Sequence, residues 1–264
     1  MIILASPGAI AFRLGGFPVY YYGICIALAA LVGVVVSYKI IKKDYKEIEP
    51  DIFFDVTTVA IISGFICARI YYCLINFEYY SIHTENIFNF RQGGLAIQGG
   101  IFGSFIITSL YCKIKKYPIL KLADIISFGI VVAQAIGRWG NFFNSEAYGL
   151  PSKHFIGTFI PETLRINGYE TYKYFHPTFL YESILNIFIF LILYFIVRKY
   201  ETKFDGIFFA YYLILYSTVR FYIEALRLDS IVNVGVFHVP QIVCILTIIA
   251  ASIFLIYKKR ITKN

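Results

Sequence analysis

Charged residues are scarce in this chain of 264 residues, because lysine, arginine, aspartate and glutamate together make up only 15% of it. Soluble globular domains carry about 25% charged residues. Hydrophobic residues make up 59% of the chain, and the mean hydropathy is +0.70. This composition excludes an ordinary soluble domain and predicts a protein that crosses a membrane several times.

Metal-ligand and redox spacings are also missing. The five cysteines form no C-x-x-C pair, and the four histidines show no H-E-x-x-H spacing. We therefore expect no disulfide and no metal site, and we expect the cysteines to be small buried hydrophobes. The opening stretch MIILASPGAIAFRLGGFP has no charged segment of the signal-peptide kind. We expect it to lie at the outer interface of the membrane.

Long apolar runs are the dominant feature of the sequence. A hydrocarbon core of about 30 Å needs about 20 apolar residues per helical crossing. Because the runs are continuous and do not alternate, they predict helices and not barrel strands. The expected fold is an all-α integral membrane protein with seven transmembrane helices in one domain, residues 1–264. The runs are 19–38, 52–76, 95–113, 119–138, 177–197, 206–226 and 237–257.

Basic residues predict the orientation. Fifteen of the 24 lie in the connections after the first, third and fifth runs and in the C-terminal tail. By the positive-inside rule these segments are cytoplasmic, so the N-terminus is outside. The net charge of +8 then reflects topology and anionic lipid, with no need for nucleic acid. The long connection 145–175 becomes an extracytoplasmic insert, either a plain surface loop or a substrate-handling element.

The sixth run carries polar residues at helical spacing. Tyr216, Arg220, Glu224 and Arg227 follow one another at i, i+4, i+8 and i+11, so they share one helix face. A charge at membrane depth costs about 2.5–3.5 kcal/mol and faces protein or a wet cavity. An internal ion network explains the face. However, two arginines to one carboxylate leave a surplus positive charge, which a bound anion would neutralise.

The stretch GRWGNFFNSEAYG ends the fourth run. Arg138, Asn141 and Asn144 recur every three residues and share a face if the helix continues. Gly137 and Gly140 would let another backbone or a ligand come close. An ordinary helix exit with a capping asparagine explains one amide but not the arginine.

Two further features suggest a cavity. Five glycines in GGLAIQGGIFG indicate either irregular backbone that lines a cavity or close helix packing. Arg69, inside the second run, is expected to face the same interior. Together these residues predict a hollow near the outer leaflet for an amphiphile with an anionic head, such as a phospholipid. A transporter for an anionic solute and a nonenzymatic lipid-binding protein are the alternatives.

The stretch GRWGNFFNSEAYG resembles the G-R-x-G-N-F-x-N-x-E signature of the prolipoprotein diacylglyceryl transferases. HPTFLYES, VRFYIEALR and GGLAIQGG resemble other blocks of that family in the same order. The resemblance implies a transferase of the bacterial inner membrane that needs no cofactor. It would move the diacylglyceryl group of phosphatidylglycerol to the lipobox cysteine of prolipoproteins, forming a thioether and releasing glycerol 1-phosphate, the first step of lipoprotein maturation.

The same resemblance implies residue roles. One arginine would hold the lipid phosphate, the amides and a glutamate beside it would shape the headgroup site, and the sixth run would act at the reacting centre. The catalytic residues expected are Arg138, Arg220 and Glu224. The residues expected to bind phosphatidylglycerol are Arg138, Asn141, Asn144, Glu146, Tyr22, Tyr216, Arg227 and Gln98.

One position departs from the family pattern. Many members have histidine in the block G-G-x-x-x-H-G-G, where this chain has Gln98, which cannot accept a proton at neutral pH. The attacking thiol has a pKa of about 8.5 and must lose its proton. Our hypothesis is that the arginine field favours the thiolate and that Glu224 accepts the proton. His176 is the alternative acceptor, although its place at a helix start also fits a structural role.

Overall fold

The computed structural model describes residues 2–89, 93–153, 155–200, 204–229, 233–234 and 236–263. The chain divides into two compact units. The first comprises Met1–Ile40 and Ala123–Asn264, and the second comprises Ile41–Leu122. The single domain over residues 1–264 stays a prediction.

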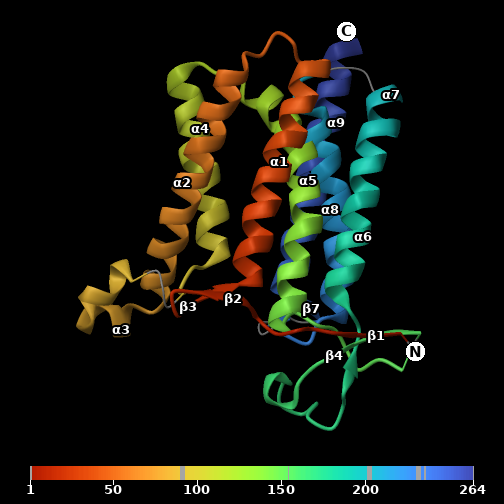
Figure 1. Cartoon of the computed structure of the whole chain (residues 1–264). Coiled ribbons are helices and arrows are strands. Elements are labelled where there is room, and N and C mark those ends of the chain that lie inside the picture. Colours follow the sequence, from red (N-terminus) through yellow and green to blue (C-terminus); the bar gives the residue numbers. More distant parts are fainter. Residues whose placement is uncertain are drawn as a thin grey trace. The chain divides into compact units, whose positions relative to one another are not determined.

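Helices that run alongside one another form most of the first unit (Figure 1). They are α1 (Tyr21–Asp44, whose last residues belong to the second unit), α5 (Ile119–Asn144, which begins in the second unit), α6 (Thr178–Leu191), α7 (Arg198–Tyr200), α8 (Ile207–Leu226) and α9 (Val239–Lys263). A π-helical segment, η4 (Ile192–Val197), continues α6. Helix α6 runs antiparallel to α5 and α8 (Figure 1).

Helices α1 and α5 cross at two glycines. A Cβ atom on Gly129 would lie 2.3 Å from the carbonyl oxygen of Gly33, closer than any side chain tolerates. Beside this crossing, the Ser37 hydroxyl donates to the Ile125 carbonyl at 3.3 Å. The small residues therefore set the distance between α1 and α5.

A carboxylate on α5 caps the start of α8. Asp124 is 1% exposed, and its two oxygens accept hydrogen bonds from the backbone amides of Gly206 at 2.7 Å and Phe209 at 2.8 Å. The first amides of a helix have no partner inside the helix, so this contact satisfies two of them. Asp124 thereby ties the position of α8 to that of α5.

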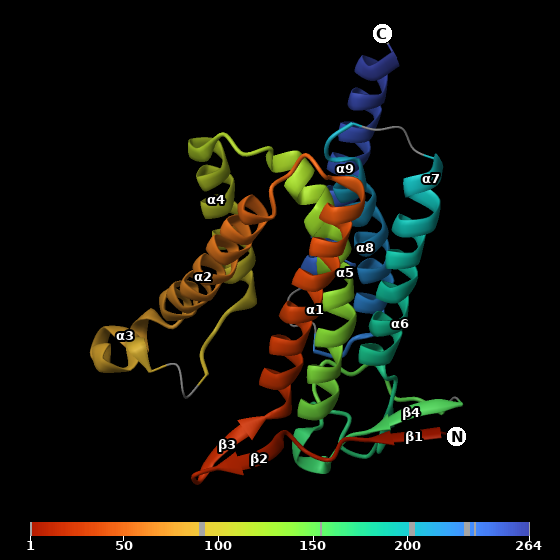
Figure 2. The same ribbon diagram turned by 45° about the horizontal axis from the view of Figure 1, so that its top comes forward.

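Short strands cover one end of the first unit (Figure 2). Strands β1 (Ile2–Ala5), β4 (Ile156–Phe159) and β5 (Tyr174–Phe175) form a sheet in the order β1-β4-β5, with β1 and β4 parallel. Strands β2 (Ile10–Leu14) and β3 (Phe17–Tyr20) form a hairpin, and β6 (Asn233–Val234) pairs with β7 (Phe237–His238). Segment 145–175, with η3 (Glu162–Leu164), is therefore a folded element around Tyr148, Ile160 and Phe175.

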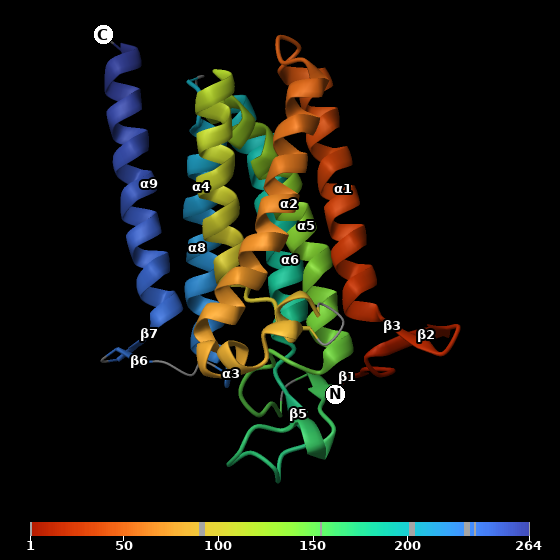
Figure 3. The same ribbon diagram turned by 90° about the vertical axis from the view of Figure 1, so that its left-hand side faces the viewer.

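The second unit is a helical hairpin with an appended arm (Figure 3). It contains α2 (Pro50–Ile75), α3 (Phe77–Ile82), η1 (Thr84–Phe88) and α4 (Ile97–Lys115). A Cβ on Gly99 would lie 2.1 Å from the Cβ of Tyr71, and one on Gly103 would lie 2.2 Å from the Cβ of Cys67. Gly99 and Gly103 of α4 thus serve close packing against α2. Gly93 and Gly94 lie before α4 in irregular backbone, with φ angles of 80°, so both interpretations of this run hold for part of it.

All seven predicted apolar runs are helical. Within the described residues, six helices are long and apolar enough to cross a membrane: α1, α2, α4, α5, α6 with η4, and α9. Helix α8 has 20 residues but is not among them, since Arg220 and Glu224 lower its hydropathy. Its place as a seventh crossing stays a prediction.

Candidate active site

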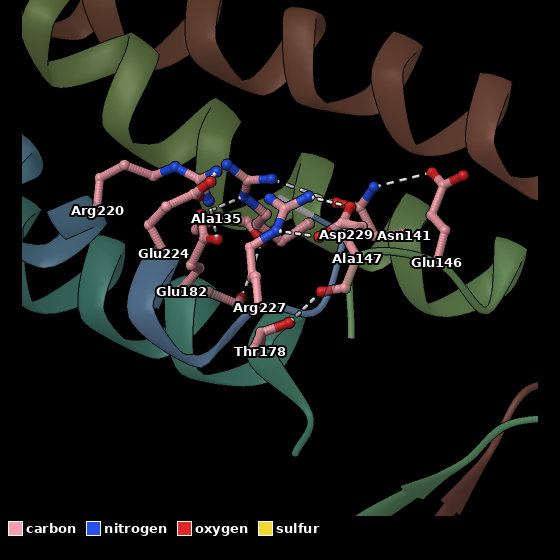
Figure 4. A network of polar contacts seen from close by, with 12 residues as sticks. Ala135, Asn141, Glu146, Ala147, Thr178, Glu182, Arg220, Glu224, Arg227 and Asp229 are labelled. Carbon is pink, nitrogen blue, oxygen red and sulfur yellow. Dashed lines mark hydrogen bonds and ion pairs between the residues drawn. The ribbon is translucent and has the colours of Figure 1, made fainter. Parts of the chain in front are cut away.

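A buried carboxylate on α6 joins the arginines of α5 and α8. Glu182 Oε2 lies 2.6 Å from Arg138 Nε, and Glu182 Oε1 lies 2.8 Å from Arg220 Nη1. The second terminal nitrogen of Arg220 pairs with Glu224, one turn further along α8. We call Arg138, Glu182, Arg220 and Glu224 the ionic cluster. Figure 4 labels Glu182, Arg220 and Glu224 in a close view. The predicted catalytic residues are therefore in one connected network.

Exposure differs within the ionic cluster. The side chains of Glu182 and Glu224 are each 3% exposed, whereas those of Arg138 and Arg220 are 22% and 15% exposed. Arg138 uses Nε for the ion pair and offers its terminal nitrogens to other groups. Nη1 makes a long contact of 3.4 Å to the Asn141 side-chain oxygen. Arg138 is thus the member that an incoming anion reaches most easily.

The residues that follow the end of α8 add a second ion pair. Arg227 donates from Nε to Asp229 at 2.8 Å and from Nη2 at 2.5 Å, in the forked geometry typical of arginine and carboxylate. Burial acts to raise the pKa of Asp229, but the hydrogen bonds and charge of Arg227 outweigh it, so that pKa is lowered. Asp229 is therefore an anion at neutral pH.

The predicted amides lie at the end of α5 and share one acceptor. Glu146 Oε1 accepts from Asn141 Nδ2 at 2.9 Å and from Asn144 Nδ2 at 3.4 Å. Ser145 and Ala147 on either side have φ angles of 53° and 56°, a region that side chains other than glycine rarely adopt. The Thr178 hydroxyl at the start of α6 holds the Ala147 carbonyl. Such strain, held in place by packing, is common at functional sites.

The predicted tyrosines take two different places. Tyr22 packs on Gly140, where a Cβ would lie 2.7 Å from its ring, and its side chain interacts electrostatically with Glu146 and Arg138. The close approach expected at Gly140 is therefore made by an aromatic ring of α1. Tyr216 stacks on Tyr212 with ring centroids 5.8 Å apart, on the α8 face that carries Arg220.

The expected surplus of positive charge is wrong. Three guanidinium groups (Arg138, Arg220, Arg227) face three carboxylates (Glu182, Glu224, Asp229). The count of charges in the sixth run omitted two carboxylates, Glu182 and Asp229, which lie outside that run. A phosphate would enter a balanced network and compete for guanidinium donors, with no bare charge to neutralise.

Arg69 in the second unit has different partners. It is 4% exposed, and it donates to the backbone carbonyls of Asn86, Ile87, Asn89, Gly93 and Gly94 at distances between 2.6 and 3.2 Å. Its guanidinium also lies 5.3 Å from the ring centre of Tyr80. These contacts tie residues 86–89 and 93–94 to α2, which is a structural role. The expectation that Arg69 faces the same interior as the residues of the sixth run stays a prediction.

His176 and Gln98 are the two other residues named for the reaction or the lipid site. His176 Nδ1 is 3.1 Å from the Tyr181 hydroxyl, and its backbone pairs with that of Leu150. Gln98 is exposed on α4 in the second unit. Gln98 as a residue of the lipid site therefore stays a prediction.

Most of the chain matches a known protein family. The family described as prolipoprotein diacylglyceryl transferase matches residues 9–257. The chain belongs to the prolipoprotein diacylglyceryl transferase family. A relative from Fervidobacterium nodosum is 41% identical over 247 residues, 93% of this chain and 83% of the relative. A relative from Clostridioides difficile is 39% identical over 255 residues, 97% of each chain. Both are named phosphatidylglycerol–prolipoprotein diacylglyceryl transferase.

Two carboxylates that pair with the predicted arginines were not predicted from the sequence. Glu182 lies in HPTFLYES, four residues after Thr178. Its signal in the sequence was a carboxylate inside an apolar helical run. Asp229 follows Arg227 by two residues, close enough for a local pair. A search for every charge in an apolar run would have found Glu182.

Proposed function

We propose that this protein transfers the diacylglyceryl group of phosphatidylglycerol to the lipobox cysteine of prolipoproteins. The cysteine sulfur forms a thioether bond to the terminal glycerol carbon, and the bond from that carbon to the phosphate oxygen breaks. Glycerol 1-phosphate leaves with the bonding electrons. Family membership and the ionic cluster support this reaction.

The observation that carries the proposal is the Glu182 bridge between two arginines of different helices. A carboxylate that accepts from both guanidinium groups fixes their orientation before the substrate arrives. Fixed positive groups in a poorly solvated site stabilise the negative charge that grows on a leaving phosphate. In this proposal Arg138 binds the phosphate with its terminal nitrogens, and Arg220 stabilises the reacting centre.

The amides at the end of α5 are proposed to shape the headgroup site. Asn141 and Asn144 have donors and acceptors suited to the hydroxyl groups of a glycerol head, and Glu146 orients both amides. Tyr22, Tyr216 and Arg227 line the same region of the first unit in this proposal.

The thiol proton needs an acceptor in the same site. Glu224 is buried, and its carboxylate pairs with Arg220 one turn along α8. We assign the proton to Glu224, from which it passes to the departing phosphate or to water. In this proposal the guanidinium donors of Arg138 and Arg220 that meet the substrate also favour the thiolate over the thiol.

Membrane orientation is part of the same proposal. Helix α8 is the seventh crossing of a bacterial inner membrane, and the ionic cluster lies in the outer half. The N-terminus and insert 145–175 are then outside, and the C-terminus is cytoplasmic. Attachment of a membrane-impermeant thiol reagent to cysteines placed in the insert and in the C-terminal tail would test this orientation.

A direct assay tests the reaction. Purified protein is incubated with phosphatidylglycerol and a lipobox peptide, and mass spectrometry measures the peptide. We expect a mass gain of one diacylglyceryl group and release of glycerol 1-phosphate, and no gain on a control peptide with serine at the cysteine position. Absence of the adduct from a folded preparation would favour a transporter or a lipid-binding protein.

A further inference from the structure

A second set of polar side chains lies one helical turn from the ionic cluster. Gln134 precedes Arg138 by four residues on α5, Asn186 follows Glu182 by four on α6, and Tyr216 precedes Arg220 by four on α8. Because α6 runs antiparallel to α5 and α8, the three offsets point in the same direction (Figure 1). We call Gln134, Asn186 and Tyr216 the polar layer, about 6 Å from the cluster along the helices.

Asn186 is the unusual member of the polar layer. It is 0% exposed, and neither its Nδ2 nor its Oδ1 atom has a hydrogen-bond partner among the described residues. Gln134 Oε1 is likewise buried without a partner in that part of the chain. Buried amides in proteins are almost always hydrogen-bonded, so a donor and an acceptor left open together point to a polar ligand group.

We propose that Asn186 is the residue that recognises the acyl ester of the lipid, by donating a hydrogen bond from Nδ2 to an ester carbonyl of the diacylglyceryl group. The inference rests on the proposed function. In phosphatidylglycerol one ester is attached to the carbon next to the reacting carbon, so its carbonyl lies within a few bonds of the phosphate. With the phosphate at Arg138, an amide one helical turn deeper is in reach of that carbonyl.

An apolar groove between helices would let a lipid reach the depth of the polar layer. An apolar groove of about 410 Å³ borders α1, α5 and α6, and its lining includes Ala135, Trp139, Ser183 and Ile187. Ala135 directly follows Gln134 in the sequence, and Ile187 directly follows Asn186. The wall between groove and layer includes the hydrogen bond from the Ser183 hydroxyl to the Ala135 carbonyl, 2.8 Å long.

The helix that carries Asn186 changes its winding further along the chain. The π-helical segment η4 begins six residues after Asn186, and π-helical turns within helices often occur at functional sites. A local change of helix winding there would let the buried amide meet a lipid ester without unfolding α6.

The experiment compares two lipids that differ only in the carbonyls. Wild-type protein and the Asn186→Leu variant are assayed by adduct mass with diester phosphatidylglycerol and with its diether analogue. We expect wild-type kcat/KM to be about tenfold higher for the diester, the size of one neutral hydrogen bond. Asn186→Leu should lower the diester value to that of the diether and leave the diether value unchanged.

The matched control is Ile189→Ala, a buried apolar residue of the same helix that is 2% exposed. It should lower stability and leave the diester-to-diether ratio unchanged. Equal loss on both lipids in Asn186→Leu would assign Asn186 to packing or water binding and overturn the proposal. Equal wild-type rates on both lipids would overturn it without any variant. No adduct with either lipid would instead count against the transferase reaction itself.

Discussion

Two arginines of this protein, buried Arg69 and partly exposed Arg138, are held by different chemistry. Arg69 in the second unit donates to five backbone carbonyls of one segment. Arg138 in the first unit pairs with a carboxylate that also pairs with Arg220. The first arrangement consists of hydrogen bonds to neutral backbone carbonyls. The second is an ion-pair network to which α5, α6 and α8 each contribute a charged side chain.

The difference shows that burial of an arginine is not by itself a sign of a ligand site. A guanidinium has five N–H donors in a fixed plane, and folded backbone can satisfy all of them. When two guanidinium groups share one carboxylate, some of their N–H donors stay open. A phosphate can bind those donors, because phosphate and carboxylate accept the same forked hydrogen bonds from arginine. Loss of Arg69 should therefore harm folding, and loss of Arg138 should harm reaction.

The largest expected effect is on turnover when Arg138 is changed. Arg138→Gln removes the cation that meets the phosphate, and we expect kcat/KM to fall about a thousandfold, as when a principal charge-stabilising donor is removed. The melting temperature should change little, because Glu182 keeps Arg220 as its partner. Initial rates of adduct formation and thermal unfolding in detergent measure the two quantities. A residual rate within tenfold of wild type would remove Arg138 from the reaction.

Arg69→Gln should give the opposite pattern. It leaves several buried carbonyls without donors, and we expect a loss of about 3 kcal/mol in unfolding free energy. Activity per folded molecule should stay within about twofold of wild type. Arg138→Gln is the matched control, since both variants make the same substitution at a hydrogen-bonded guanidinium. A large loss of kcat with normal stability would place Arg69 in the active site and break the comparison.

Glu182→Gln should have the next largest effect. The amide keeps the shape of the carboxylate but turns an N–H toward one of the two guanidinium groups, so their shared orientation is lost. We expect kcat to fall about a hundredfold with a smaller change in KM, and Glu182→Asp to restore part of the rate. Glu162→Gln, an exposed glutamate of η3, is the control. A rise in KM alone would indicate that Glu182 only aids binding.

Asp124→Asn tests the buried carboxylate of α5, which caps α8 and belongs to no ion pair in the described residues. The amide keeps one acceptor for Gly206 or Phe209 and presents a donor to the other amide. We expect a loss of about 1–2 kcal/mol in unfolding free energy. Asp205→Asn, at a neighbouring exposed aspartate, should have no such effect. Equal stability of both variants would mean that the cap contributes nothing.

The sequence predicted local features well and tertiary partners less well. Seven apolar runs became helices within a few residues, because hydrophobicity and length decide such segments. The shared face of Arg220 and Glu224 also followed from helical spacing. Spacing on one helix does not reveal which other helix supplies Glu182, nor that the backbone near Gly93 folds over Arg69. Those contacts depend on packing between segments distant in sequence.

The smallest expected effect concerns Gln98, where many relatives have histidine. If Glu224 accepts the thiol proton, Gln98→His adds an unused base, and kcat/KM should stay within about twofold of wild type. A histidine that took part would add an ionisation near pH 6.5 to the pH–rate profile. We therefore expect the profiles of wild type and Gln98→His to coincide between pH 5.5 and 8, about the range in which histidine titrates. Glu224→Gln is the comparison variant, and its kcat/KM should fall. A rate gain with a new limb in the Gln98→His profile would show that a base at position 98 reaches the thiol, and would link the two units in one active site.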